Sequence, residues 1–148
     1  MISEDKNGIF SEISGAVSGA LDSNSDRAQK HADLYYESVR SMTADILNIS
    51  ENTGFAVEEI KRIKEHIFIK EHDLGNTEKQ RFDTDYDIAQ SWQRLIDGRS
   101  IEAHDIILLR HELLEIELME QGYSQQEAHD ITNLAFNYRR ALRERAGL

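Results

Sequence analysis

The sequence predicts an all-α protein in which about five helices form a compact bundle. The 148 residues include no proline, whereas average usage of ~5% would supply about seven, so the chain lacks an obligatory helix breaker. Hydrophobic residues make up 39% of the chain, which is enough for a core and excludes wholesale disorder. Apolar residues recur at helical spacing, and no segment shows the period-two alternation of a half-buried strand.

The beginning of the chain differs in composition from the rest. Gly8, Gly15 and Gly19 interrupt the short apolar face of this segment, and each glycine lowers helix stability. We expect residues 1–25 to be a flexible leader or linker, native or left from a larger protein. Residues 26–148 are expected to form a single helical domain.

The first long helix is predicted over residues 26–51 by a heptad pattern. Its apolar residues are spaced alternately by four and three over three heptads, as in an a/d seam. Such a narrow seam suits packing on one long partner, either within the bundle or in a second copy of the chain, so a homodimer stays open. The seam residues are Ala28, Ala32, Tyr35, Val39, Met42, Ile46 and Ile49.

Glycines and capping boxes mark the ends of the remaining helices. Thr84 with Asp87, and Ser124 with Glu127, have the spacing of a capping box. Glycine suits the left-handed position after a helix. The expected helices run from about residue 56 to 71, from Thr84 to Gly98, from about residue 101 to 121 and from Ser124 onward, with a loop over residues 72–79.

Charge and composition exclude several classes of function. The chain has 17 Lys and Arg against 28 Asp and Glu, a formal net charge of -11, which disfavours nucleic-acid binding through a broad basic face. Nucleic acid is therefore expected only as a substrate. Cysteine is absent, which excludes disulfides, thiolate zinc sites and cysteine nucleophiles. The apolar runs are too short to span a membrane, and the first residues do not form a secretory signal.

A histidine and a glutamate on the predicted fourth helix have metal-ligand spacing. His111 and Glu115 are four residues apart and therefore share one helical face. His129 on the next helix would supply a third ligand, and His66 on the second helix a fourth. Imidazole and carboxylate ligands without thiolate suit zinc, or manganese or iron where carboxylates dominate. We therefore predict a divalent metal such as zinc at His111, Glu115 and His129.

The same residues allow two further interpretations. Glu112 follows His111 directly, at the general-base position of a His-Glu-x-x-His helix, although glutamate stands where that motif has its second histidine. Without a metal, His111 could act as an acid–base group with Glu112 or Glu115, because imidazole titrates near neutrality. In a purely structural role the carboxylates would be solvated or paired with a nearby arginine. The predicted catalytic residues are His66, His111 and Glu112.

A series of short motifs follows in order along residues 52–138: Asn52-Thr53-Gly54-Phe55, Ile63-Lys64-Glu65-His66-Ile67-Phe68, the run from Arg81 to Ala89, Trp92-Gln93-Arg94-Leu95, His104-Asp105, Arg110-His111-Glu112-Leu113 and Glu127-Ala128-His129. In this order they resemble an uncharacterised C-terminal module of phage minor-head (head-morphogenesis) proteins and of large polymorphic toxins of Gram-positive bacteria. The resemblance implies an effector module carried by phage or secretion-associated proteins. It brings no established set of catalytic residues.

Two classes of function follow. The module could be a His/Glu-dependent hydrolase, such as a nuclease-like toxin, with the residues at 66, 111, 112, 115 and 129 lining a cleft. Alternatively, it is a non-enzymatic helical module that docks on an immunity, phage or secretion partner. Convergence of the histidines would favour the first class, and an exposed apolar surface the second. We expect the protein in the cytoplasm of the producing bacterium, with export by a signal-independent route left open.

Overall fold

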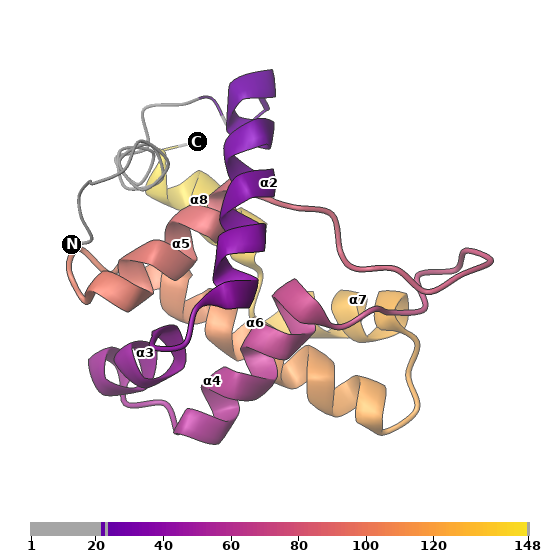
Figure 1. Ribbon diagram of the computed structural model, residues 1–148. Helices are drawn as coiled ribbons and strands as arrows, with labels where there is room; N and C mark the ends of the chain where they lie inside the picture. Colours follow the sequence, from indigo (N-terminus) through magenta and orange to yellow (C-terminus); the bar gives the residue numbers. More distant parts are fainter. Residues whose placement is uncertain (1–21, 23, 148) are drawn as a thin grey trace. The chain divides into compact units, whose positions relative to one another are not determined.

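The computed structural model describes residue 22 and residues 24–147, and the regular secondary structure of these residues is helical (Figure 1). This confirms the predicted fold class. The described residues contain seven α-helices and one π-helix, which is more than the five helices predicted, and they contain no β-strand. None of these helices has both the length and the low polarity needed to cross a bilayer. The predicted leader over residues 1–25 lies outside the described residues, except for its last few positions.

The chain divides into two compact units, each of which is described by itself. Unit 1 combines the described part of Met1–Gly54 with Asp83–Ile101. Within this unit, α2 and α3 each pack against α5. The bounds are Asp26–Ser41 for α2, Asp45–Thr53 for α3 and Tyr86–Asp97 for α5. The single domain predicted over residues 26–148 stays a prediction.

The helix predicted over residues 26–51 is interrupted, so its heptad seam does not follow one continuous helix. The backbone of Met42 is extended, with ψ 144°, and α3 begins at Asp45. The buried Asp45 carboxylate accepts a hydrogen bond from Trp92 Nε1 at 3.2 Å, so a contact with α5 helps to fix where α3 starts. Met42 and Ile46 beside the break are half-buried. The other five seam residues are fully buried: Ala28, Ala32, Tyr35, Val39 and Ile49.

The beginning of α5 also differs from the prediction. The residue that caps it is Asp85, whose side chain accepts a hydrogen bond from the Ile88 N–H at 3.0 Å. The predicted cap, Thr84, instead donates its hydroxyl hydrogen to Asp33 and accepts a hydrogen bond from Gln29, both on α2. A tertiary contact therefore takes the hydroxyl away from the helix end.

The end of α5 is fixed by a close approach to α3. Gly98 has the predicted left-handed conformation, with φ 71°. The Asn52 side chain donates hydrogen bonds to the carbonyls of Leu95 and Ile96 at 2.9 and 3.0 Å. A Cβ atom at position 98 would lie 2.7 Å from the Asn52 side chain, so both the backbone angle and the available space require glycine here.

Unit 2 combines Phe55–Phe82 with the described part of Glu102–Leu148. Its longest helix, α6, packs against α4, α7 and α8 and also contacts the π-helix η1 (Figure 1). The bounds are Val57–Lys64 for α4, Glu65–Ile69 for η1, Ala103–Glu120 for α6, Gln125–Ala135 for α7 and Tyr138–Arg145 for α8.

The last predicted helix is divided into α7 and α8. It begins as predicted, because Ser124 Oγ accepts from the Glu127 N–H at 3.1 Å and the Glu127 carboxylate accepts from the Ser124 N–H at 2.9 Å. It stops before Phe136, and the Asn137 side chain caps α8 by accepting from the Arg140 N–H at 2.9 Å. A cap residue inside the predicted helix therefore starts a new one.

Candidate metal centre

All five predicted site residues lie together in unit 2. Helix α6 supplies His111, Glu112 and Glu115, which are buried. The π-helix η1 supplies the buried His66, and α7 supplies the half-buried His129. Their ligand atoms form two groups of three that share Glu115. We call His111, Glu115 and His129 the first ligand group, and His66, Glu112 and Glu115 the second ligand group.

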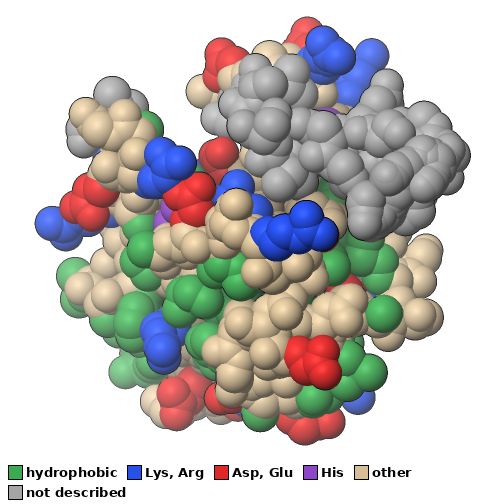
Figure 2. Space-filling model, turned by 90° about the vertical axis from the view of Figure 1, so that its left-hand side faces the viewer, with side chains coloured by type: hydrophobic (Ala, Val, Ile, Leu, Met, Phe, Trp, Pro, Cys, Tyr) green, Lys and Arg blue, Asp and Glu red, His purple; other side chains and the backbone are tan. Residues whose placement is uncertain are grey.

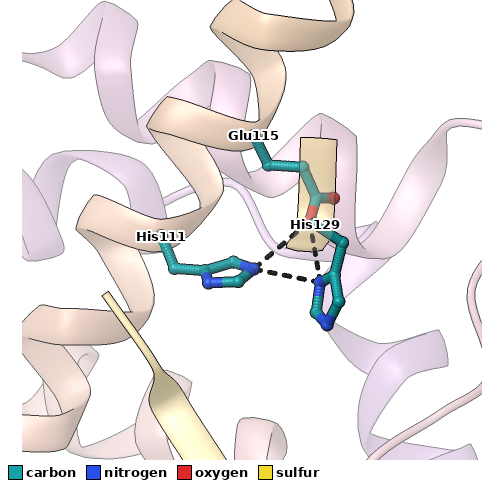
Figure 3. A group of neighbouring side chains, drawn as sticks. All are labelled: His111, Glu115 and His129. Atoms are coloured by element: carbon teal, nitrogen blue, oxygen red, sulfur yellow. Dashed lines mark hydrogen bonds and ion pairs between the residues drawn. The ribbon is translucent and has the colours of Figure 1, made fainter. Parts of the chain in front are cut away.

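The first ligand group is a nearly equilateral triangle of three atoms (Figure 3). His111 Nε2 lies 3.2 Å from Glu115 Oε1 and 3.3 Å from His129 Nδ1. His129 Nδ1 lies 3.1 Å from the same carboxylate oxygen. Two ring nitrogens and one carboxylate oxygen thus point at a common centre from α6 and α7.

A backbone carbonyl orients the His111 ring. His111 Nδ1 lies 2.8 Å from the carbonyl oxygen of Phe136, and a carbonyl can only accept, so Nδ1 carries a hydrogen and donates. In the neutral ring Nε2 then carries a lone pair that faces the carboxylate of Glu115. Two acceptors face each other in this arrangement unless His111 gains a second proton or a cation lies between them.

His129 occupies the solvent side of the first ligand group. Its side chain is 42% exposed, against 4% for His111 and 2% for Glu115. The hydrogen bond to Glu115 raises the pKa of His129, although partial burial acts in the opposite direction. The Asn133 amide nitrogen lies 3.2 Å from Nε2 of His129, one helical turn further along α7, and so limits rotation of the ring.

The second ligand group depends on the π-helix. His66 Nε2 lies 2.8 Å from Glu115 Oε2 and 3.7 Å from Glu112 Oε1. The wider turn of η1 carries His66, and π-helical turns are frequent at functional sites. The His66 ring packs edge-on against His72 and Phe82, with ring centroids 4.6 and 5.3 Å apart.

The side chain of His72 contacts His66 and Phe82, and its described hydrogen bond and ring contacts do not include the two glutamates. Its Nε2–H donates to the carbonyl oxygen of His66 at 2.8 Å, and its ring stacks on Phe82. An antiparallel bridge between His72 and Gln80 holds the backbone of this segment. Burial lowers the pKa of His72, which favours the neutral ring that such packing requires.

The two buried glutamates of α6 differ in protonation. Burial raises the pKa of Glu112 well above its ordinary value, and the charge of Glu115 adds to this. Burial also raises the pKa of Glu115, but its contacts with the imidazoles of His111, His129 and His66 outweigh burial and hold that pKa far below the ordinary value. Glu115 is therefore the ionised member of the pair, and Glu112 keeps its proton to higher pH unless a cation is present.

Three polar contacts to side chains of the first ligand group were not predicted from the sequence. Asn133 stands four residues after His129, a spacing that could have identified it. Gln125 reaches Glu115 Oε2 with its amide nitrogen at 3.5 Å, and nothing in its sequence position indicates this. The carbonyl of Phe136 is free to accept from His111 because α7 ends there. The apolar periodicity continues through this point of the sequence, so it does not indicate that a helix ends.

The other histidine of α6, His104, is not part of the candidate metal site. The ring of His104 lies near Asp105, with 3.4 Å between Nε2 and the carboxylate, and 5.9 Å from the ring of Tyr138. His104 is buried to the same degree as His111, and it belongs to neither ligand group. It therefore provides a matched control for substitutions of His111.

The first ligand group offers two imidazoles and one carboxylate, which are ligand types found in zinc sites. Three protein ligands with one side open to solvent are typical of catalytic zinc, whereas structural sites are closed by a fourth ligand.

Comparison of the chain with protein-family models, with curated proteins and with solved structures gives no match.

Proposed function

We propose that the chain is a metal-dependent hydrolase whose first ion is bound by His111, Glu115 and His129. The observation that carries this proposal is the regular triangle formed by the three ligand atoms, with edges of 3.1, 3.2 and 3.3 Å. For tetrahedral zinc with bonds of about 2.0–2.1 Å, neighbouring ligand atoms are about 3.3 Å apart. The side chains are therefore spaced as an ion would require without rearrangement.

The burial pattern supports a catalytic role over a structural one. His111 and Glu115 are buried on the protein side, and the exposed part of His129 leaves a side open to solvent. A divalent ion held by His111, Glu115 and His129 would supply Lewis-acid activation of water for hydrolysis. The carbonyl of Phe136 would keep Nε2 of His111 directed at the ion.

The biological setting rests on the resemblance of residues 52–138 to phage minor-head and polymorphic-toxin modules. We propose an effector of this kind, nuclease-like or acting on another hydrolysable bond, in the cytoplasm of the producing bacterium before any signal-independent export. Its protein partner would be an immunity, phage or secretion component. Figure 2 shows acidic as well as basic side chains among the described residues, and the formal net charge of the chain is -11. A negative net charge disfavours nucleic acid as a broad-surface ligand, so the proposal includes nucleic acid only as a substrate.

Expression of the full chain in a bacterium tests the proposal. We expect the wild type to arrest growth and to purify with a divalent metal, and His111→Ala to abolish the growth arrest and to lower the metal content. His104→Ala is the control, because it replaces an equally buried histidine on the same helix. An inert wild-type chain that purifies without metal and binds none when zinc is added would contradict the proposal.

A second candidate function is docking without catalysis, and exposed apolar side chains on α7 favour it. Leu134 is 88% exposed, and Ile131, one turn before it, is 38% exposed. Contiguous exposed apolar surface is typical of sites of protein contact. If docking is the function, Leu134→Ser abolishes the effect on growth and His111→Ala does not.

A further inference from the structure

The carboxylate of Glu115 uses its two oxygens for two different groups of ligands. Oε1 faces His111 Nε2 at 3.2 Å and His129 Nδ1 at 3.1 Å. Oε2 faces His66 Nε2 at 2.8 Å. A carboxylate that presents one oxygen to each of two ligand groups has the arrangement of a bridging ligand between two metal ions.

The second ligand group is complete enough to bind an ion of its own. Its three ligand atoms, from His66, Glu112 and Glu115, lie within 4.8 Å of one another. The three residues are buried, and they come from different elements, η1 and α6. Small shifts of the Glu112 carboxylate, now 3.7 Å from His66 Nε2, would bring the three atoms to the distances that metal ligands have.

The charges of the buried side chains also favour a second ion. Two glutamates lie side by side on α6 with little contact with solvent. Two carboxylates in one buried site cannot both be ionised without a large cost. No lysine or arginine is recorded in an ion pair with either glutamate among the described residues, and their recorded ionic partners are the histidines alone. An ion in the second ligand group would contact both carboxylates, which an ion in the first ligand group alone would not.

We propose that the centre binds two divalent ions, the first in the first ligand group and the second in the second ligand group, with Glu115 as the bridge between them. This inference rests on the proposed function, because both ions share Glu115. It assigns His66 and Glu112 as ligands, in place of the acid–base roles that the sequence predicted. In two-metal hydrolytic sites the ions lie about 3.5–4 Å apart, a distance that one bridging carboxylate can span.

Metal counting on the purified full-length chain tests the second ion. The protein is stripped with a chelator, titrated with zinc against a chromophoric competitor, and analysed for bound metal after removal of excess. We expect two ions for the wild type and for His104→Ala. We expect one ion for His66→Ala and for Glu112→Gln, in which the amide keeps the size of the side chain. His129→Ala should retain the second ion and lose the first.

The outcomes separate the two proposals. No bound ion in the wild type would overturn the proposed function together with this inference. One ion in the wild type, unchanged by His66→Ala and Glu112→Gln, would overturn the second ion and leave the first. Loss of both ions in Glu112→Gln with an unchanged helical circular-dichroism spectrum would also overturn the assignment, because that variant leaves the first ligand group intact.

Manganese provides an independent measurement of the bridge. Two manganese ions joined by one carboxylate are magnetically coupled, and their electron paramagnetic resonance spectrum differs from that of an isolated ion. We expect the coupled spectrum in the wild type and in His104→Ala, and an isolated-ion spectrum in His66→Ala. Two bound ions without coupling would overturn Glu115 as the bridge.

Discussion

His111 Nδ1 lies 2.8 Å from the carbonyl oxygen of Phe136, the residue at which α7 ends. In an unbroken helix that carbonyl would accept from an N–H four residues later. The interruption between α7 and α8 makes it available to the imidazole. The end of a helix thus determines which nitrogen of His111 carries the hydrogen and which faces Glu115, so the interruption is part of the centre.

Asn133→Ala is expected to weaken metal binding without unfolding the protein. The Asn133 amide lies 3.2 Å from Nε2 of His129. If the Asn133 amide is turned so that its oxygen faces the His129 ring, that oxygen would accept the Nε2 hydrogen. The lone pair of His129 Nδ1 would then be left for the ion. Loss of such a contact typically reduces metal affinity by about 10–100-fold. Competition titration with zinc measures the change.

The control for this variant is Gln126→Ala on the same helix. Gln126 donates a hydrogen bond to the exposed Asp130 and has no recorded contact with the centre. Zinc affinity should be unchanged in Gln126→Ala. Equal losses of affinity in the two variants would show that α7 as a whole, and not the Asn133 contact, accounts for the effect.

Removal of metal is expected to lower the thermal stability of the wild type. A ligand that binds only the folded state at about 100 times its Kd stabilises it by about 2.7 kcal/mol. For a chain of this size that corresponds to roughly 5–10 °C in Tm. Differential scanning calorimetry with and without a chelator measures the shift. The chelator should have the same effect on His104→Ala and a smaller effect on His111→Ala, which keeps only the second ligand group intact. An equal shift in His111→Ala would contradict the first ligand group.

Gly98→Ala is expected to destabilise unit 1 more than Gly54→Ala does. Both glycines end a helix with a left-handed backbone, at φ 71° and 84°, so alanine costs about 1–2 kcal/mol at either position. A Cβ atom at position 98 would also lie 2.7 Å from the Asn52 side chain, whereas nothing lies within 4 Å at position 54. Displacing Asn52 would cost about 0.5–1.5 kcal/mol more for each lost hydrogen bond. Urea unfolding of the two variants provides the comparison.

Tyr35 is expected to make the protein less stable at alkaline pH. Burial, and next the charges of Asp97 and Asp45, raise the pKa of Tyr35 well above its ordinary value. The unfolded chain releases this proton near pH 10 or so, while the folded chain keeps it, so ionisation favours the unfolded state. The contribution of Tyr35 is therefore complete below about pH 10 and is lost as pH rises toward the folded pKa, by up to about 1.4 kcal/mol per pH unit.

Free energies of unfolding measured in urea across this pH range test the prediction. Tyr35→Phe removes the ionising group and should give a shallower slope than the wild type. The variant also removes the hydrogen bond that Tyr35 donates to Gln93 at 2.9 Å, so the slope and not the absolute stability is the readout. Identical slopes would contradict a raised pKa for Tyr35.

Much of the fold could be predicted from local patterns. The absence of proline and the helical spacing of apolar residues indicated the all-α class, and Gly98 and the capping box at Ser124 marked helix ends where the structure has them. The heptad seam identified buried positions correctly at five of its seven residues. Local patterns failed where a distant side chain intervenes, as at Asp45, which contacts Trp92, and at Thr84, which contacts Asp33.

Part of the candidate site could be predicted because helical periodicity fixes which residues lie on the same face of a helix. His111 and Glu115 share a face of α6 through their spacing alone, and the sequence by itself determined that pair, the all-helical class and the exclusion of thiolate chemistry. Only the tertiary structure decided that His66 and His129 meet the two oxygens of the same Glu115 carboxylate. The packing of η1 and α7 on α6 and the point at which α7 ends are set by contacts between residues far apart in the chain, which no local spacing encodes.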